Sequence, residues 1–145
     1  MSNKSHVVCT QCGAVNAVAE GRDPRAAKCG KCAAQLFTGK PADVDTAGLL
    51  KHMERSDIPV LVDVWAPWCG PCRQMSPMFE RATIELEPDI RTLKLNADNA
   101  PEICARYGIR GIPALLLLRH GKLLAQSAGV MDAANIVRWT RTHAA

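Results

Sequence analysis

The sequence predicts an α/β fold in which a central mixed sheet is flanked by helices and is preceded by a small cysteine-rich module. The chain has 145 residues, enough for one ordinary domain with a small appendage. Strand-like and helix-like patterns alternate over residues 41–145, whereas residues 1–40 contain two Cys-x2-Cys pairs and few large apolar residues. We therefore expect two parts, a four-cysteine module over 1–38 and an α/β domain over 39–145.

The first half of the α/β domain predicts two strands and two helices. Residues 43–45 form a short strand, and Thr46 can cap a helix that runs to Arg55. Residues 58–65 are nearly all apolar and largely β-branched, which is typical of a strand buried on both faces. A helix follows over 69–86, and Pro77 inside it predicts a kink.

The second half adds three strands and two helices. Residues 91–96 alternate in polarity like a strand, and Pro101 suits the first turn of a helix that reaches Tyr107. Residues 114–119 form an apolar strand, which a tight turn at His120 and Gly121 joins to a strand over 122–127. An amphipathic helix over 132–142 completes the order β-α-β-α-β-α-β-β-α.

Composition and charge exclude several classes of protein. Apolar residues make up 48% of the chain and charged residues 22%, but no apolar run approaches the ~20 residues of a membrane span. The first six residues lack the apolar core of a secretory signal, so we expect a cytoplasmic protein without a membrane partner. Residues 1–40 carry a net charge of +4, but no aromatic residue precedes Phe37 to stack on a base, so we expect no nucleic-acid partner.

Four of the seven cysteines predict a metal site in the N-terminal module. Cys9, Cys12, Cys29 and Cys32 form two Cys-x2-Cys pairs that are 16 residues apart, the spacing of a structural zinc ribbon with one Zn²⁺. The apolar content of the module is too small to build a core, so metal binding would order it. The alternative is a set of free or disulfide-paired thiols without metal. Cys104 stands alone, and we interpret it as a small residue in a helix rather than a regulatory thiol.

The third pair, in Trp68-Cys69-Gly70-Pro71-Cys72, predicts redox chemistry. It lies where a buried strand ends and a helix begins, and the unpaired N–H groups of the helix N-terminus stabilise a thiolate at Cys69. Cys72 lies on the same helix face and can form a disulfide with Cys69. These features suit thiol–disulfide exchange, in which Cys69 attacks a disulfide and Cys72 displaces the product. The alternatives are half of a metal site or two buried thiols.

Residues 63–72 (Asp-Val-Trp-Ala-Pro-Trp-Cys-Gly-Pro-Cys) and 107–113 (Tyr-Gly-Ile-Arg-Gly-Ile-Pro) resemble the thioredoxin family. The resemblance covers residues 41–145 and implies the thioredoxin fold. It implies that Asp63 is a buried acid behind the dithiol that takes the proton of Cys72, with Lys94 near it. Desolvation of that acid should raise its pKa.

The resemblance also implies a substrate surface around the dithiol. Pro113 corresponds to the cis-proline of the family, and Val64 departs from the phenylalanine of many thioredoxins. With the cysteine module, nearly the full chain resembles the zinc-binding bacterial thioredoxin-2 subclass. The implied substrate-binding residues are Trp68, Gly70, Pro71, Ile112, Pro113 and Gly129.

The residues and the resemblance together predict a general protein-disulfide reductase that maintains cytoplasmic redox homeostasis and oxidative-stress defence. Its partners would be disulfide-containing client proteins and, as electron donor, thioredoxin reductase. We expect a monomer without an organic cofactor. The alternative is a redox-controlled holdase or docking protein in which the zinc ribbon is the functional part. An oxidant or isomerase is disfavoured because the family associates Gly70-Pro71 with reductants.

Overall fold

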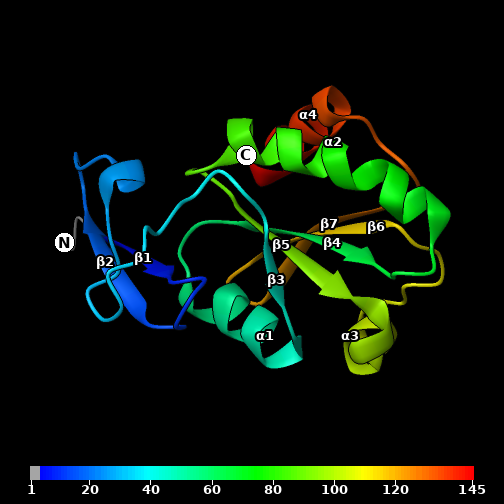
Figure 1. Ribbon diagram of the computed structural model, residues 1–145, viewed down its shortest axis with the longest axis horizontal. Helices are drawn as coiled ribbons and strands as arrows, with labels where there is room; N and C mark the ends of the chain where they lie inside the picture. The colour runs from blue at the N-terminus through cyan, green and yellow to red at the C-terminus, as the bar shows by residue number, and fades with distance from the viewer. Residues whose placement is uncertain (1–3) are drawn as a thin grey trace.

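The computed structural model describes residues 4–145, so residues 1–3 of the expected module lie outside the described part. A two-stranded sheet comes first, and a five-stranded sheet with four helices follows (Figure 1). None of the helices over residues 4–145 is long and apolar enough to span a bilayer. The strands are β1 Lys4–Val8, β2 Val15–Ala19, β3 Ala42–Val44, β4 Val60–Trp65, β5 Arg91–Asn96, β6 Ala114–Arg119 and β7 Lys122–Ala128. The helices are α1 Thr46–Arg55, α2 Gly70–Leu86, α3 Pro101–Arg106 and α4 Ala133–Ala144.

The five-stranded sheet has the order β3-β5-β4-β6-β7 and is mixed. Strands β3, β5 and β4 are parallel, whereas β6 is antiparallel to both β4 and β7. Helices α1 and α3 cover one face of the sheet, and α2 and α4 cover the other (Figure 1). This arrangement confirms the predicted fold class and the predicted order of elements.

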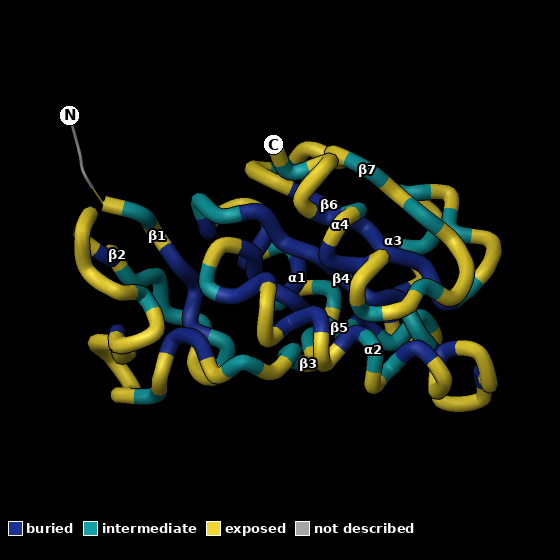
Figure 2. The backbone as a smooth tube through the Cα atoms, turned by 90° about the horizontal axis from the view of Figure 1, so that it is seen from above, coloured by how far each residue is buried: buried dark blue, intermediate teal, exposed yellow. Residues whose placement is uncertain are grey.

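Strand β4 is the middle strand of the sheet, and both of its faces are covered by helices. Val60, Val62 and Val64 join the apolar cluster on the α1 and α3 side, whereas Leu61 joins the cluster on the α2 and α4 side. Side chains alternate along a strand, so Asp63 shares the face of Leu61 and points toward the α2 side. The tube in Figure 2 is buried along most of β4 and β6. Full burial of each valine or leucine side chain on these strands contributes ~1.5–3 kcal/mol to the stability of the fold.

The helix ends differ slightly from the sequence expectations. Asp45 rather than Thr46 caps α1, since its carboxylate accepts a hydrogen bond of 2.7 Å from the backbone N–H of Gly48. Cys69 is the N-cap of α2 rather than its first residue. Helix α2 runs without interruption through Pro77, and the kink there stays a prediction.

The N-terminal module has a small core, which the sequence reasoning did not expect. Strands β1 and β2 form an antiparallel hairpin over residues for which the sequence analysis predicts no strand. Ile58 of the α/β domain packs against the apolar side chains of the module, and this contact adds apolar surface to the small core. The chain between the two expected parts is held at Gly39, whose N–H donates to the carboxylate of Glu87 at 2.8 Å. The buried members of this core are Val7, Cys9, Val18, Ala27, Cys29, Leu36 and Phe37.

The module lies against the end of the central sheet where β4 and β5 begin (Figure 1). The N–H of Asp57 donates to the carbonyl of His6, and the N–H of Val8 donates to the hydroxyl of Ser56. The dithiol follows the other end of β4, so the two groups of cysteines lie at opposite ends of the sheet. The division at residue 38 stays a prediction.

Candidate functional site

The dithiol lies at the junction of β4 and α2. Cys69 and Cys72 form a disulfide, and their Cα atoms are 5.2 Å apart. The Sγ atom of Cys69 accepts a hydrogen bond of 3.2 Å from the backbone N–H of Cys72, one of the free donors at the start of α2. Gly70 and Pro71 form the first turn, where the missing N–H of proline costs nothing. The helix N-terminus therefore faces a sulfur, as the sequence predicted.

Two other segments complete the surroundings of the disulfide. The Sγ atom of Cys69 lies 3.8 Å from the carbonyl oxygen of Ile112, and the Ile112–Pro113 peptide bond is cis, as the resemblance implies. The N–H of Gly129 donates to the carbonyl of Pro113 at 2.9 Å. The structure thus brings residues 69, 112, 113 and 129 together from distant parts of the sequence. Cys69 and Cys72 are 5% and 2% exposed.

Trp68 is the main exposed apolar side chain beside the disulfide. It is 68% exposed, yet its indole N–H donates to the carboxylate of Asp98 at 3.1 Å. A fixed, exposed aromatic ring offers contact area at a low entropy cost. The sequence reasoning missed Asp98 because nothing in the spacing of residues 68 and 98 indicates that their side chains meet.

Asp63 and Lys94 lie side by side on the neighbouring strands β4 and β5. The register of β4 and β5 pairs these two residues directly, and Asp63 is 1% exposed. Burial raises the pKa of Asp63 to about 7, and the positive charge of Lys94 acts in the opposite direction. The ammonium of Lys94 donates to the hydroxyl of Ser76 at 3.0 Å and lies over the ring of Trp65. Within residues 4–145, neither carboxyl oxygen of Asp63 has a hydrogen-bond partner.

The four cysteines of the N-terminal module converge as their spacing predicted. The sulfur atoms of Cys9, Cys12, Cys29 and Cys32 lie within 4.8 Å of one another. The Cys9–Cys32 sulfurs are 3.7 Å apart and the Cys12–Cys29 sulfurs 3.5 Å. Zinc–sulfur bonds of ~2.3 Å place the sulfurs of a regular tetrahedron about 3.8 Å apart. The four thiols therefore fit a tetrahedral metal ion of this size.

The two cysteine turns have the same backbone design. Each ends four residues after its first cysteine in the left-handed region, at Gly13 (φ 77°) and at Ala33 (φ 66°). The N–H groups of Gln11 and Lys31 donate to the sulfurs of Cys9 and Cys29 at 3.3 and 3.4 Å. These donors point toward the sulfurs, which stabilises negative charge on them.

The pKa values of the sulfurs respond to this crowding. Backbone hydrogen bonding, most of all from Cys32, lowers the pKa of Cys29 to about 6. The N–H of Ala34 acts to lower the pKa of Cys32, but burial and the thiols of Cys12, Cys9 and Cys29 raise it to about 11. Four thiolates this close repel one another unless a cation lies between them. The donor set therefore fits a metal ion by charge as well as by distance.

Cys104 lies apart from both groups of cysteines. It is half-buried in α3, at the edge of the cluster formed by α1, α3 and the sheet. Burial raises the pKa of its thiol, which disfavours the reactive thiolate at neutral pH.

Comparison with known proteins gives the family. The family model described as thioredoxin matches residues 42–142. Thioredoxin C-3 of Corynebacterium nephridii is 31% identical over 133 residues, which covers 92% of this chain and 91% of the relative. Thioredoxin 1 of a Nostoc species is 38% identical over 102 residues, which covers 70% of this chain and 95% of the relative. The first of these alignments must therefore include part of the N-terminal module.

Solved structures agree with the fold. A mutant thioredoxin from Halobacterium salinarum superposes with a TM-score of 0.66 at 25% identity, over 75% of this chain and 95% of that chain. Thioredoxin from Malassezia sympodialis gives a TM-score of 0.67 at 23% identity, over 75% and 95% of the two chains. The chain belongs to the thioredoxin family of thiol-disulfide oxidoreductases, and the four-cysteine arrangement of its N-terminal module fits the thioredoxin-2 subclass.

Proposed function

We propose that this thioredoxin is a general protein-disulfide reductase of the cytoplasm that works in redox homeostasis and oxidative-stress defence. The observation that carries the proposal is the Cys69–Cys72 disulfide at the start of α2, beside the exposed ring of Trp68. Thioredoxins act on disulfide-containing substrates and are reduced by thioredoxin reductase. Disulfide-containing client proteins would be the substrates here, and thioredoxin reductase would supply two electrons from NADPH for each turnover.

Substrate reduction begins at Cys69. Its thiolate, stabilised by the N–H of Cys72 and the helix N-terminus, attacks one sulfur of the client disulfide. The Cys69–client bond forms, the client S–S bond breaks, and the second client sulfur leaves as a thiolate that takes a proton from water. Cys72 then attacks the Sγ atom of Cys69, and this step releases the first client sulfur as a thiolate and forms the Cys69–Cys72 disulfide.

Asp63 would accept the proton that Cys72 loses. Its raised pKa of about 7 means that the carboxylate and the acid are both populated near neutral pH, which suits proton transfer in either direction. Lys94 would keep the pKa of the acid from rising further, because its positive charge favours the carboxylate. Both residues act behind the dithiol, on the buried side.

The client chain would lie over the exposed side. Trp68 and Ile112 would contact its apolar groups, while Pro113 and Gly129 would align its backbone beside Cys69. Gly70 and Pro71 present little side chain above the disulfide, which leaves the approach to Cys69 open. The contact of the Gly129 N–H with the Pro113 carbonyl supports a common surface made by these two loops.

The N-terminal module would hold one structural Zn²⁺ on Cys9, Cys12, Cys29 and Cys32. Bound zinc would supply a fixed junction between the two cysteine turns and would take no part in electron transfer. The close approach of the four sulfurs supports this proposal. The protein would work as a monomer.

Insulin reduction tests the proposed activity. We expect Cys69→Ser to lose turnover entirely, because no other thiolate lies at a helix N-terminus beside Trp68 in the described part of the chain. Cys104→Ser is the matched control and should retain the wild-type rate, since Cys104 lies apart from the dithiol. Turnover that persists in Cys69→Ser would contradict the assignment of the nucleophile.

A further inference from the structure

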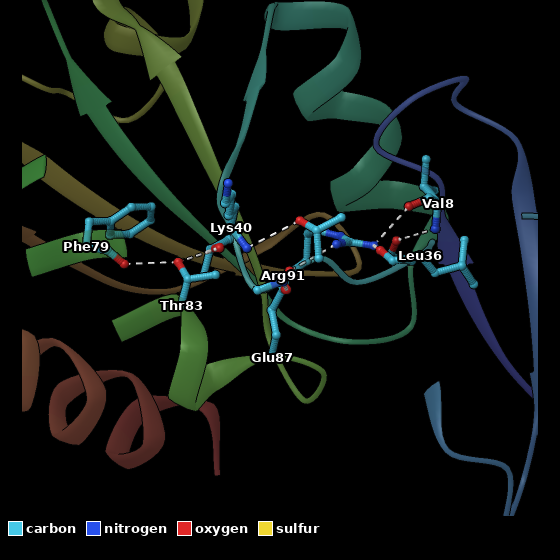
Figure 3. A network of polar contacts seen from close by, with 11 residues as sticks. Val8, Leu36, Lys40, Phe79, Thr83, Glu87 and Arg91 are labelled. Atoms are coloured by element: carbon cyan, nitrogen blue, oxygen red, sulfur yellow. Dashed lines mark hydrogen bonds and ion pairs between the residues drawn. The ribbon is translucent and has the colours of Figure 1, made fainter. Parts of the chain in front are cut away.

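Arg91 is a buried arginine that links the α/β domain to the N-terminal module. It is the first residue of β5 and is 1% exposed. Its guanidinium pairs with the carboxylate of Glu87 at 3.1 Å and donates to the carbonyl oxygens of Val8 at 3.3 Å and Leu36 at 2.8 Å. It also lies 4.4 Å from the centre of the Phe37 ring. Figure 3 shows the Arg91 side chain directed toward the module.

Three of these four partners belong to the module. A guanidinium removed from water needs nearly complete hydrogen bonding, because a buried charge without partners is strongly destabilising. Glu87 supplies one partner, but the carbonyl groups of Val8 and Leu36 are present only when the module is seated. The burial of Arg91 therefore depends on the position of residues 8 and 36.

Val8 and Leu36 are directly connected to the metal-binding turns. Val8 precedes Cys9, and its N–H donates to the hydroxyl of Ser56 while its carbonyl accepts from Arg91. The α/β domain thus holds both sides of the Val8 residue. Leu36 follows the second turn, and its N–H donates to the carbonyl of Ala27 on the other side of Cys29. Arg91 therefore reaches the backbone beside both halves of the metal site.

Charge supports the same connection. Burial lowers the pKa of Arg91, whereas the negative charges of Glu87 and then Cys9 act to raise it. The guanidinium also reaches the carbonyl of Val8, the residue before Cys9, so its positive charge lies beside the first cysteine turn. Four thiolates around a divalent ion leave a net negative charge, which a buried cation nearby stabilises.

We propose that Arg91 is a positioning residue for the metal site, so that a side chain of the thioredoxin domain sets how tightly the N-terminal module binds zinc. The inference rests on the proposed zinc site. It also has a reciprocal consequence, because two coupled equilibria must influence each other equally. Zinc binding in the module stabilises the thioredoxin domain through the same contacts.

Zinc affinity of the full-length, reduced protein tests the proposal, measured by competition with a chromophoric chelator. Loss of an outer-shell partner typically lowers metal affinity ~10–100-fold, and we expect a loss of this size for Arg91→Met. Arg91→Lys keeps the charge without the forked geometry and should give an intermediate value. Arg141→Met is the matched control, because Arg141 also donates to a backbone carbonyl, that of Glu85, but away from the module. It should bind zinc like the wild type.

A second variant covers the case in which Arg91→Met leaves Glu87 buried without a partner and fails to fold. Arg91→Met with Glu87→Gln removes both charges and keeps an acceptor for the N–H of Gly39. This variant should show the same loss of zinc affinity. A folded variant that binds zinc as tightly as the wild type would overturn the role of Arg91. A wild-type protein that binds no zinc would instead overturn the zinc site itself.

Tryptophan fluorescence tests the reciprocal consequence. Trp65, Trp68 and Trp139 all lie in the thioredoxin domain, so their emission reports its unfolding and not that of the module alone. Chelation of zinc should lower the thermal midpoint of the wild type by several degrees and that of Arg91→Met by clearly less. A wild-type midpoint unchanged by chelation would overturn the coupling.

Discussion

Among single residues, Asp63 shows most clearly how burial of an acid costs free energy. It is almost fully buried on the central strand, without a hydrogen-bond partner in the described part of the chain. The rise of its pKa to about 7 corresponds to a cost on the order of 4 kcal/mol when the carboxylate is charged. Such a cost at a packed position is typical of a functional group rather than a structural one.

Replacement of this acid should therefore change how stability depends on pH. The folded state holds the proton of Asp63 more tightly than the unfolded state, so wild-type stability falls as the pH rises from about 4 to about 7. Asp63→Asn removes this dependence. We expect the variant to match the wild type near pH 4 and to exceed its free energy of unfolding by up to about 4 kcal/mol at pH 8. Urea unfolding of the disulfide form at several pH values measures this difference.

The exposed Asp89 provides the control for this prediction. For Asp89→Asn, the free energy of unfolding should depend on pH as it does in the wild type, because the Asp89 side chain is exposed to water in the folded state as well as in the unfolded state. A stability difference between Asp63→Asn and the wild type that stays constant from pH 4 to pH 8 would show that Asp63 does not titrate in this range.

The candidate site residues were predictable from the sequence where one short segment contains the complete motif. The Cys69–Cys72 pair and the four module cysteines are examples, because each pair needs only local spacing. Asp98 and Ser76 were missed, since each acts through a contact with a distant residue, Trp68 or Lys94. Arg91 was missed for a similar reason, because a lone arginine at the start of a strand does not indicate burial.

At the scale of the element, α1 shows how a helix end is fixed by one side chain. The carboxylate of Asp45 accepts from the N–H of Gly48, whereas the hydroxyl of Thr46 is buried without a partner in the described part of the chain. The sequence analysis placed Asp45 in the preceding strand and expected Thr46 as the cap, although aspartate and threonine are both good N-caps. Only the backbone geometry distinguishes them.

The two residues make a matched pair of substitutions. Asp45→Ala removes the cap and should lower the free energy of unfolding by ~1 kcal/mol. Thr46→Ala removes a hydroxyl that makes no hydrogen bond and should cost clearly less. Chemical unfolding of both variants measures the two losses of free energy of unfolding. An equal or larger loss for Thr46→Ala would contradict the observed cap.

The elements of the α/β domain were predictable because their hydrophobic patterns are long and regular. The strand at 91–96 and the strand at 114–119 match the predicted bounds. The hairpin of β1 and β2 was not predicted, since strands of five residues without regular alternation of polar and apolar residues carry almost no periodic signal. Its order comes from packing on Ile58 and from the contacts at Ser56, Asp57 and Arg91.

In the whole molecule, the central sheet lies between two groups of cysteines, the Cys69–Cys72 disulfide and the four cysteines of the module. The dithiol follows the end of β4 at Trp65, while the module lies near Val60 and Arg91, where β4 and β5 begin. Six strand residues span roughly 20 Å. A separation of this order disfavours disulfide exchange between the Cys69–Cys72 pair and the four cysteines of the module, so one chain can carry both groups.

In the proposed reaction, the sulfur of Cys69 attacks the client disulfide. Cys72→Ser keeps this nucleophile and removes the thiol that would release the client, so the mixed disulfide should accumulate. The most direct measurement is mass spectrometry of peptides from this variant after reaction with insulin, under non-reducing conditions. We predict one insulin chain joined to the peptide that contains Cys69. No adduct, or an adduct at Cys104 or at a cysteine of the module in place of Cys69, would contradict the role of Cys69 as the attacking sulfur.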